Sequence, residues 1–471
     1  MSAVLVFMPA VLSGMLLVQV LWPDRTFWNL AFKSFLGVGV GLGLRSLLYF
    51  LYLLILPAQN AFIYLDLAFL GCMLIMAIAR QQRQRPSWRP VPAFPSLTGT
   101  QRIFVLISGI VFVISLLSTA NYLLRRRQGD WDAWMMYNRA ARFVYFDQAH
   151  WMESFSPQMS PIFHADYPLL LAMNIVAGWE MLGRDSAAVP MLQSAFFAVA
   201  CVGLATSALA AVKSVGQAAL GLTLLWGIPV FVNEGARQMA DVPMAFFVLA
   251  TGTLLYLFVL HRGAGLLPLA GLTTGLAAWT KNEGSVLVVG AFAAVVVLGF
   301  ALQDQWRTMI RFAAGLAVPL AVVLLFKLFL APSGDIVSAA AGGSLSQMGD
   351  GSRHTLILQY LWSEIRGFGS WRIPMLGIGI LPVLALYAVI FRSPVRPELR
   401  LAYRAGITML VIQLLGYYAA YLVSPYDLAW HLSYSSGRVV LQLFPLLLFL
   451  TLCASLEAEY ILAPGRLPAT E

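Results

Sequence analysis

The sequence has very little charge: only 11% of its 471 residues are Asp, Glu, Lys or Arg, whereas 60% are hydrophobic. A soluble protein of this length carries roughly 25% charged residues. The mean hydropathy of +0.79 points the same way. This scarcity of charge excludes an ordinary soluble domain and predicts an all-α polytopic membrane protein.

Cysteine is equally scarce, because the chain contains only Cys72, Cys201 and Cys453, each within an apolar run. This excludes a disulfide framework and a cysteine metal site. The N-terminus lacks the basic region of a cleavable signal peptide, so we expect residues 3–22 to remain as a membrane span. The net charge of +9 requires no nucleic-acid partner, because Lys and Arg in short loops set topology and contact anionic membrane lipids.

Most of the sequence consists of long apolar segments. A spanning helix needs about 20 predominantly apolar residues, and about thirteen segments meet this requirement. We interpret a further apolar run, 217–232, as a short or re-entrant helix, because the topology counted from both ends agrees only if residues 166–240 cross the membrane twice. The expected spans are 3–22, 31–56, 61–79, 103–124, 166–183, 187–211, 241–260, 264–280, 284–301, 310–331, 373–391, 403–423 and 439–457.

Arginine-rich segments predict the cytoplasmic side of the membrane. They occur between the third and fourth expected spans and again after residue 391. The fourth span then leads outward, which places the following loop in the periplasm if the membrane is a bacterial inner membrane. We divide the chain into N-terminal spans (1–80), a cytoplasmic linker (81–102), a catalytic transmembrane module (103–331) with outer loop 125–165, an extracytoplasmic loop (332–372), and C-terminal spans (373–471) with outer loop 424–438.

The first large outer loop contains a segment with helical periodicity. Trp134, Tyr137 and Ala141 recur at helical spacing, which is typical of an amphipathic helix lying in the headgroup plane. An aromatic belt would explain the rings. It would not explain the carboxylates and His164 among them.

The few polar residues gather on the expected outer face. Several lie at the edges of apolar helices, where ionisable groups are costly and tend to face a cavity or a partner. We therefore expect them to form a shared site. The groups are Asp130 with Asp132; His164 with Asp166 and Tyr167; Asp241 with Glu234 and Arg237; Lys281 with Glu283; and His431 with Arg438.

The acidic residues each allow a structural and a functional interpretation. Asp132 is our candidate for a general base, with Asp130 as the second choice, although an Asp before a helix also commonly caps it. Asp241 precedes Val-Pro at the start of a helix. That position fits a cap, or a second carboxylate that binds a metal or orients an acceptor.

The basic residues allow two interpretations as well. The planar fork of Arg438 suits a phosphate, and a headgroup anchor is the alternative. Lys281 and Glu283 either belong to the site or simply pair with each other at a helix break.

Arg125 and Arg126 lie on the outer side, against the positive-inside rule. Phosphate binding and interfacial anchoring explain this exception equally well. For His164 and His431 we favour hydrogen-bonded structural roles over ligand roles.

The motifs carrying these residues resemble a known group in their order. They are Asp-Ala-Trp at 132–134, Asp-Tyr-Pro-Leu-Leu-Leu at 166–171, Ala-Asp-Val-Pro at 240–243, Trp-Thr-Lys-Asn-Glu-Gly at 279–284, and Asp-Leu-Ala-Trp-His-Leu with Ser-Ser-Gly-Arg at 427–438. Together they resemble bacterial GT-C glycosyltransferases of the protein-mannosyltransferase and aminoarabinose-transferase superfamily. The chain differs from that pattern in three extra N-terminal spans, in an outer loop without the usual Asp-Glu pair, and in lacking a large C-terminal periplasmic domain.

The resemblance implies a GT-C-type fold and an inverting transfer of a sugar from a polyprenyl-phosphate donor. The implied acceptor is extracytoplasmic: a lipid-linked glycan, lipopolysaccharide or another cell-envelope polymer. Asp132 matches the catalytic position, and Arg438 matches a basic residue near the lipid phosphate. Asp241 matches a second acidic position, which in some relatives helps to hold a divalent metal such as Mg, Mn or Zn; Asp132 and Asp241 are the corresponding candidate ligands here.

The chemistry leads to the same assignment of roles. Inverting displacement needs a base on the face opposite the leaving group. Polyprenyl phosphate departs as an anion, so positive charge must stabilise it. We assign the donor phosphate to Arg438, Lys281, Arg125, Arg126 and His431, and the acceptor or second site to Asp241, Glu283, His164, Asp166 and Tyr167.

Two other functions remain open. A secondary transporter or a flippase of lipid-linked sugars places ionisable residues near the bilayer midplane on broken helices, often in two related halves. Here the acids lie at one edge and no internal repeat is visible. A non-catalytic subunit of a glycan-assembly complex is the other alternative.

Overall fold

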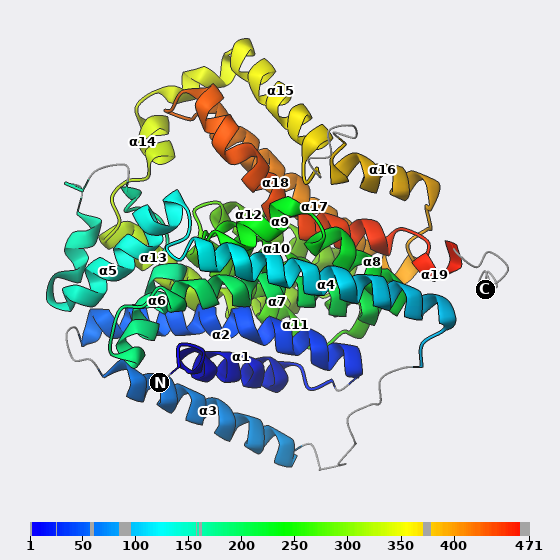
Figure 1. Ribbon diagram of the computed structural model, residues 1–471, viewed down its shortest axis with the longest axis horizontal. Helices are drawn as coiled ribbons and strands as arrows, with labels where there is room; N and C mark the ends of the chain where they lie inside the picture. The colour runs from blue at the N-terminus through cyan, green and yellow to red at the C-terminus, as the bar shows by residue number, and fades with distance from the viewer. Residues whose placement is uncertain are drawn as a thin grey trace.

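The computed structural model describes residues 2–24, 26–56, 61–83, 96–156, 158–159, 163–370 and 378–461. These residues form helices joined by turns and short loops (Figure 1). An isolated antiparallel bridge joins Arg392 to Ser455. The all-α class predicted from composition is therefore confirmed.

Nine of the described helices are long and apolar enough to cross a membrane. This confirms that the protein is a polytopic membrane protein. The nine are α2 (Phe27–Ile55), α3 (Phe62–Arg83), α4 (Gly99–Arg125), α7 (Ala188–Val212), α10 (Asp241–His261), α12 (Gly284–Ala301), α13 (Gln305–Phe329), α17 (Arg400–Leu422), which follows the short η6 (Pro397–Leu399), and α18 (Leu428–Cys453).

Four other predicted spans form shorter apolar helices. Even the longest of them, Leu5–Leu21, rises only about 26 Å, less than the roughly 30 Å of a hydrocarbon core. The expected number of about thirteen spans is therefore not confirmed. The start of the predicted span 373–391 lies outside the described residues. The four are η1 (Leu5–Phe7) with α1 (Met8–Leu21), α6 (Leu170–Leu182), α11 (Leu266–Thr280) and α16 (Ile380–Ile390).

The apolar run 217–232 forms a bent pair of helices. α8 (Val215–Trp226) and α9 (Pro229–Ala236) meet at an angle of 67°, so the pair is either one broken span or a re-entrant loop. A proline at the start of α9 fits the bend, because its ring fixes φ and it has no N–H to donate to the preceding turn. The interpretation of this run as something other than a straight span agrees with the structure.

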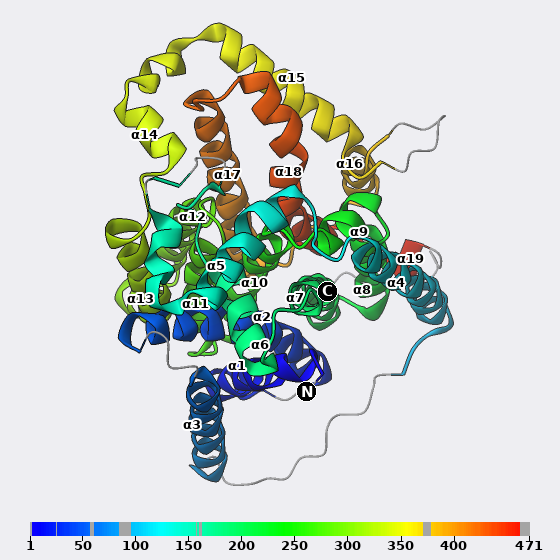
Figure 2. The same ribbon diagram turned by 60° about the vertical axis from the view of Figure 1, so that its left-hand side comes forward.

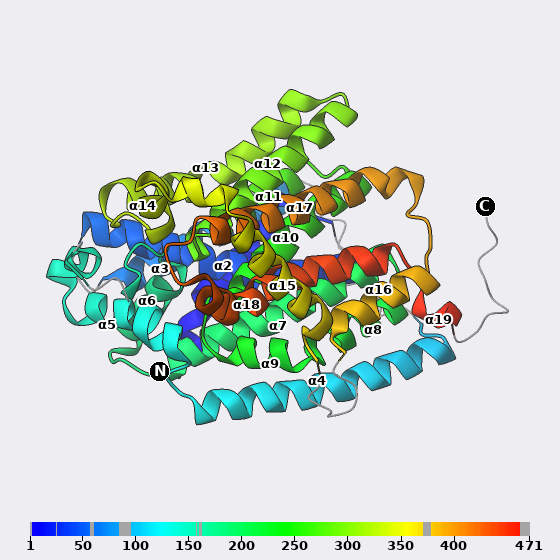
Figure 3. The same cartoon turned by 90° about the horizontal axis from the view of Figure 1, so that it is seen from above.

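α10 lies at the centre of the bundle, with its whole apolar window buried. It packs against α7, α11, α17 and α18, and Figure 3 shows it enclosed by these helices. A helix that is apolar on every face requires such an environment. By contrast, α3 and α4 lie at the periphery (Figure 2), where only 17% of each apolar window is buried, as expected of helices that face lipid.

The outer segments contain more helix than their low hydropathy suggests. The first outer loop forms a π-helical turn, η2 (Ala133–Tyr137), followed by α5 (Asn138–Phe146) and η3 (Gln148–Phe155). The predicted loop 332–372 forms α14 (Asp335–Ala341), η5 (Ser344–Gly349) and α15 (Gly351–Gly367). Figure 2 shows α14 and α15 arching over the ends of α17 and α18. The short α19 (Ala458–Ile461) is the last described element.

The last long helix begins earlier than predicted. We expected a span at 439–457 after an outer loop at 424–438, whereas α18 runs from Leu428 to Cys453. The carboxylate of Asp427 caps it by accepting a hydrogen bond from Trp430 N at 2.8 Å. Its first turns are rich in Ser, Tyr and His, so hydropathy alone does not reveal them. Arg438 therefore lies inside a helix and not in a loop.

The lipid-exposed helix α3 is held by a buried ion pair. Arg45 Nε in α2 lies 3.3 Å from Asp66 Oδ2 in α3, and both side chains are 1% exposed. Arg45 Nη1 also donates to Val6 O at 2.7 Å. Charges at this depth are tolerated only when they are paired.

We predict that Asp66→Ala destabilises the protein strongly, by about 3–5 kcal/mol, because it leaves the Arg45 guanidinium buried without its partner. Replacing both residues with apolar ones, Arg45→Met with Asp66→Leu, should cost much less. Thermal unfolding in detergent, followed by tryptophan fluorescence, measures both. Equal losses of Tm in the single and double variants would contradict this account.

Candidate functional site

Five charged side chains from four separate segments meet at one place. Asp132 comes from the first outer loop, Asp241 begins α10, Lys281 and Glu283 lie at the break between α11 and α12, and Arg438 comes from α18. Salt bridges join all five. We call these residues the ionic cluster. It brings together members of four of the five polar groups identified in the sequence.

Asp241 is the centre of the ionic cluster and is fully buried. Its Oδ1 accepts from Lys281 Nζ at 2.9 Å and from Gln442 Nε2 at 2.7 Å. Its Oδ2 accepts from Arg438 Nε at 2.8 Å. The hydroxyl of Tyr417 in turn donates to Gln442 Oε1. A buried carboxylate is tolerated only with such a complete set of partners.

Arg438 is shared between two carboxylates. Its Nη2 lies 2.7 Å from Asp132 Oδ2 and 2.8 Å from Asp241 Oδ2. Asp132 is the more accessible of the two, with its side chain 24% exposed against 1% for Asp241. Neither carboxylate accepts a capping hydrogen bond at the start of its helix, so the capping interpretation does not hold for either residue.

Lys281 links Asp241 to Glu283. Its Nζ lies 2.8 Å from Glu283 Oε1, so this pair does form at the helix break, but within the larger cluster. Burial lowers the pKa of Lys281, yet the charges of Asp241 and Glu283 raise it more, and the net pKa lies above its ordinary value. Lys281 therefore stays cationic. Glu283 Oε2 is buried without a hydrogen-bond partner.

Asp130 positions the loop that carries Asp132. Its Oδ2 accepts from Arg237 Nε at 2.6 Å, its N–H donates to Arg237 O at 3.1 Å, and Arg237 also pairs with Glu234. The adjacent Gly129 has φ +77°, and a Cβ there would lie 2.6 Å from Arg237 O. Only glycine permits this approach. Asp130 thus anchors the loop instead of joining the ionic cluster.

The environment keeps Asp130 ionised. Burial raises its pKa, but hydrogen bonds from Arg237 and from Trp131 N–H, with the charge of Arg237, lower it more, so the pKa lies below its ordinary value of 3.8. Arg237 also pairs with Glu234, which lies three residues before it, a spacing at which helical side chains are neighbours.

The predicted site residue Asp166 lies in a neighbouring polar network. It accepts from Asn282 Nδ2 at 2.8 Å, and Lys327 Nζ lies 3.5 Å from its carboxylate. Lys327 also donates to Asn282 Oδ1 at 2.7 Å. This network fixes the break between α11 and α12 to α13, which places Lys281 and Glu283. The next residue, Tyr167, is half-buried and faces a separate pocket.

Each of the two predicted histidines contacts a polar side chain, His164 in an ion pair and His431 in a hydrogen bond. His164 Nδ1 lies 3.3 Å from Asp335 Oδ2, and the hydroxyl of Tyr426 donates to the same carboxylate. His431 Nδ1 lies 2.8 Å from Ser424 Oγ. These contacts tie the outer segments together.

Arg125 and Arg126 lie at the end of α4, away from the ionic cluster's contacts. Arg125 Nε donates to Asn121 Oδ1 at 3.1 Å. Arg126 pairs with Asp130 at 3.4 Å and its guanidinium lies over the ring of Tyr122 at 5.1 Å. The structure thus gives both arginines local partners at the interface.

Sequence reasoning missed three residues at the site: Tyr137, Tyr417 and Gln442. A glutamine in an apolar helix is a detectable signal, because a polar group at that depth needs a partner. Tyrosines carry no such signal among so many aromatics. Tyr137 is 3% exposed, and its hydroxyl has no hydrogen-bond partner.

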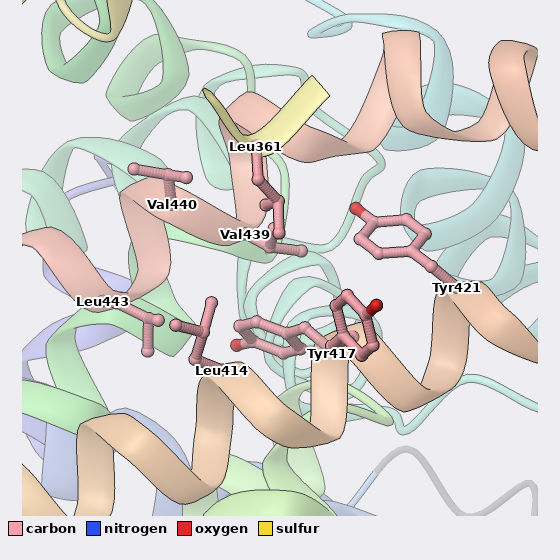
Figure 4. A pocket seen from close by; sticks show the side chains of 8 residues that line it. Leu361, Leu414, Tyr417, Tyr421, Val439, Val440 and Leu443 are labelled. Atoms are coloured by element: carbon pink, nitrogen blue, oxygen red, sulfur yellow. The ribbon is translucent and has the colours of Figure 1, made fainter. Parts of the chain in front are cut away.

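An apolar pocket adjoins the cluster. It lies between α15, α17 and α18 and is lined by Leu361, Tyr417, Tyr421, Val439 and Leu443 among others (Figure 4). Tyr417 connects this pocket to the ionic cluster. Its ring lines the pocket, and its hydroxyl donates to Gln442, which in turn donates to Asp241. The apolar pocket therefore opens beside a buried charge.

A second pocket, the aromatic pocket, lies on the side of the first outer loop. Its lining includes Tyr137, Arg139, Phe163, His164 and Tyr167. The pKa of the Tyr137 hydroxyl is raised by burial and by the charges of Asp241 and Asp132. Tyr137 therefore lies close enough to the ionic cluster to be affected by its charges, while its side chain also lines the aromatic pocket.

The pair Asp132 and Asp241 does not fit a divalent metal in this arrangement. Arg438 Nη2 lies between their Oδ2 atoms, where a shared ion would sit. Within the described ranges, no group of three or more His, Cys, Asp or Glu side chains is placed to hold a metal. Structural sites need several such ligands. We derive no chemical step through a metal.

No protein-family model, curated protein or solved structure matches the chain. The GT-C resemblance therefore remains a prediction from the sequence. Any functional conclusion depends on the residues and their geometry.

We predict that Arg237→Met loosens the first outer loop, because Glu234 loses its charged partner and Asp130 loses the nearer of its two. Amide hydrogen exchange in residues 128–140 should accelerate about 10- to 100-fold, as expected for the loss of charged hydrogen bonds. Arg366→Met, on exposed α15, is the matched control and should leave this exchange unchanged. Unchanged exchange in Arg237→Met would contradict the anchoring role.

The same anchor should respond to acid. Because the folded pKa of Asp130 lies below the unfolded value of 3.8, its ion pair stabilises the fold above that value and is lost as pH falls through the folded pKa. We therefore expect residues 128–140 to loosen only below about pH 3.8 in the wild type. In Asp130→Asn, hydrogen exchange in residues 128–140 should already be fast at neutral pH. Lowering the pH should then cause no further change through residue 130. Hydrogen exchange across a pH series measures both.

Proposed function

We propose that the protein is an integral membrane glycosyltransferase that transfers a sugar, with inversion, from a polyprenyl-phosphate donor to an extracytoplasmic acceptor. The observation that carries this proposal is the position of Arg438. Its guanidinium is shared by an accessible and a buried carboxylate, Asp132 and Asp241, beside an apolar pocket. A cation, a candidate base and an apolar surface are the three features that such a donor requires.

The cations suit the departing phosphate. Asp241 holds both Lys281 and Arg438, so two positive charges are preorganised before any substrate arrives. Preorganised charge costs no reorganisation when negative charge develops in the transition state. The apolar pocket would accept the first units of the lipid, while the phosphate would contact Arg438 at the boundary.

Asp132 would act as the base. When the donor phosphate binds Arg438 Nη2, it competes with Asp132 for that nitrogen, whereas Asp241 keeps its bond to Nε. The released carboxylate then takes the proton of the acceptor hydroxyl. The acceptor oxygen bonds to the anomeric carbon as the bond from that carbon to the phosphate oxygen breaks, and polyprenyl phosphate leaves with its electron pair.

The proposed location follows from the topology. Arginine-rich segments predict the cytoplasmic side, so the ionic cluster would lie near the opposite face. In a bacterium with two membranes this is the periplasmic face of the inner membrane. The acceptor would be a lipid-linked glycan, lipopolysaccharide or another cell-envelope polymer, and surrounding lipids complete the set of partners.

One observation favours a transporter or flippase instead. The broken pair α8 and α9 carries the charged Glu234 near its end, and discontinuous helices with ionisable residues are typical of secondary transporters. Transport of a lipid-linked sugar would move the intact donor across the bilayer. It would therefore produce no free polyprenyl phosphate.

We predict that Asp132→Asn abolishes transfer, with a loss of at least 100-fold, about the contribution of a general base. Purified protein in nanodiscs would receive a panel of radiolabelled polyprenyl-phosphate sugars together with native membrane extract. Release of polyprenyl phosphate is the measured quantity. Donor binding and Tm should stay close to wild type.

Asp427→Asn, which changes a helix cap outside the ionic cluster, is the matched control and should still release polyprenyl phosphate. No release by wild-type protein with any donor would favour the transporter or subunit alternatives. If Asp132→Asn released as much polyprenyl phosphate as wild type, Asp132 would not be the base, but the protein would still be a transferase.

Arg438→Lys tests the phosphate role separately. Lysine keeps the charge near Asp241 but loses the fork that binds two oxygens in parallel. We expect a raised KM for the lipid-phosphate donor, by about tenfold or more, as for the loss of one charged hydrogen bond. An unchanged KM would remove Arg438 from the donor site.

A further inference from the structure

The aromatic pocket contains a cationic side chain that is incompletely satisfied. Arg139 Nε donates to Met135 O at 3.0 Å, and the guanidinium carbon lies 4.4 Å from the centroid of the Phe163 ring. Its Nη1, however, is buried without a hydrogen-bond partner. A buried charged donor left unpaired is costly.

The pocket itself offers no anion to this arginine. None of the described residues that line it is acidic. The other ionisable base in the lining, His164, is already engaged with Asp335. Arg139 is therefore the cation that remains for a ligand.

The rest of the lining suits the edge of a sugar ring. Phe155, Phe163 and Tyr167 present aromatic surfaces, and the Tyr137 hydroxyl is a second buried polar atom without a partner. Ligand sites typically combine such apolar walls with a few convergent polar groups. A pyranose has apolar C–H faces and hydroxyl edges that match this combination.

We propose that the aromatic pocket binds an anionic saccharide, whose carboxylate or phosphate pairs with Arg139. This inference rests on the proposed function, in which the pocket would hold the acceptor. Tyr137 lines the pocket and ends the turn η2, which directly follows Asp132, so a sugar bound there would lie near the ionic cluster. The substrate class would then be an acidic glycan.

The test measures binding without any donor, by titration calorimetry on the full-length protein in nanodiscs. Three trisaccharide probes differ only in their terminal sugar: glucuronate, glucose 6-phosphate or neutral glucose. We expect wild type to bind at least one acidic probe about tenfold more tightly than the glucose probe, the gain expected of one charged hydrogen bond. The tighter of the two acidic probes identifies carboxylate or phosphate as the anion.

Variants show whether Arg139 causes the preference. Arg139→Gln should remove it and Arg139→Lys should keep part of it. Arg142→Gln is the matched control, because Arg142 lies on the same helix but pairs with Asp185 and should leave the preference intact. Equal binding of acidic and neutral probes, no binding of any probe, or a preference that survives in Arg139→Gln would overturn the inference.

The outcome is separable from that of the proposed transfer reaction. If the protein prefers acidic probes but turns over no donor, the saccharide-binding inference holds and the transferase proposal is wrong. If the protein turns over a donor but shows no preference for acidic probes, the transferase proposal holds and the inference of an anionic substrate is wrong.

Discussion

The site depends on one constraint, the complete burial of the Asp241 carboxylate at the start of the central helix α10. A charge at that position requires partners from the surrounding helices, and Lys281, Arg438 and Gln442 supply them. Those partners come from the α11–α12 break and from α18. The same ion pairs that allow the helices to pack therefore also hold the two cations, Lys281 and Arg438, at one place. Removal of the carboxylate would take one partner from each cation, leaving Lys281 with Glu283 and Arg438 with Asp132, so stability and the proposed phosphate site cannot be separated there.

Asp132 occupies a different position in this arrangement. Its bond to Arg438 is the more exposed of the two carboxylate contacts, and its loop is held from the other side by Asp130 and Arg237. An exposed ion pair is weak and exchangeable, whereas a buried one is costly to break. In the proposed mechanism, this asymmetry would allow a phosphate to replace Asp132 on the guanidinium while Asp241 stays in place. In that mechanism, the apolar pocket would receive the lipid of the donor and the aromatic pocket would receive the acceptor.

The fold class and the charged residues of the site could be predicted from the sequence, but the ion pairs between those residues could not. Charge scarcity and apolar runs were enough for the membrane class and for most helix positions. The cost of ionisable groups at helix edges was enough to identify Asp132, Asp241, Lys281 and Arg438 as one site. Which partner each would take depends on how helices far apart in the sequence pack, and a single sequence does not contain that information. The start of α18 was missed because its first turns are polar. The buried pair of Arg45 with Asp66 had a visible signal, two charges inside apolar helices, that we did not use.

The most direct test of this account is the contact of Arg438 in the presence of polyprenyl phosphate. A cryo-electron microscopy structure of the wild-type protein in nanodiscs with excess polyprenyl phosphate would measure it. The account predicts the phosphate about 3 Å from Arg438, the lipid in the apolar pocket, Asp132 released from the guanidinium, and Asp241 still bound to it. A phosphate bound elsewhere, with the Asp132–Arg438 pair intact, would contradict it.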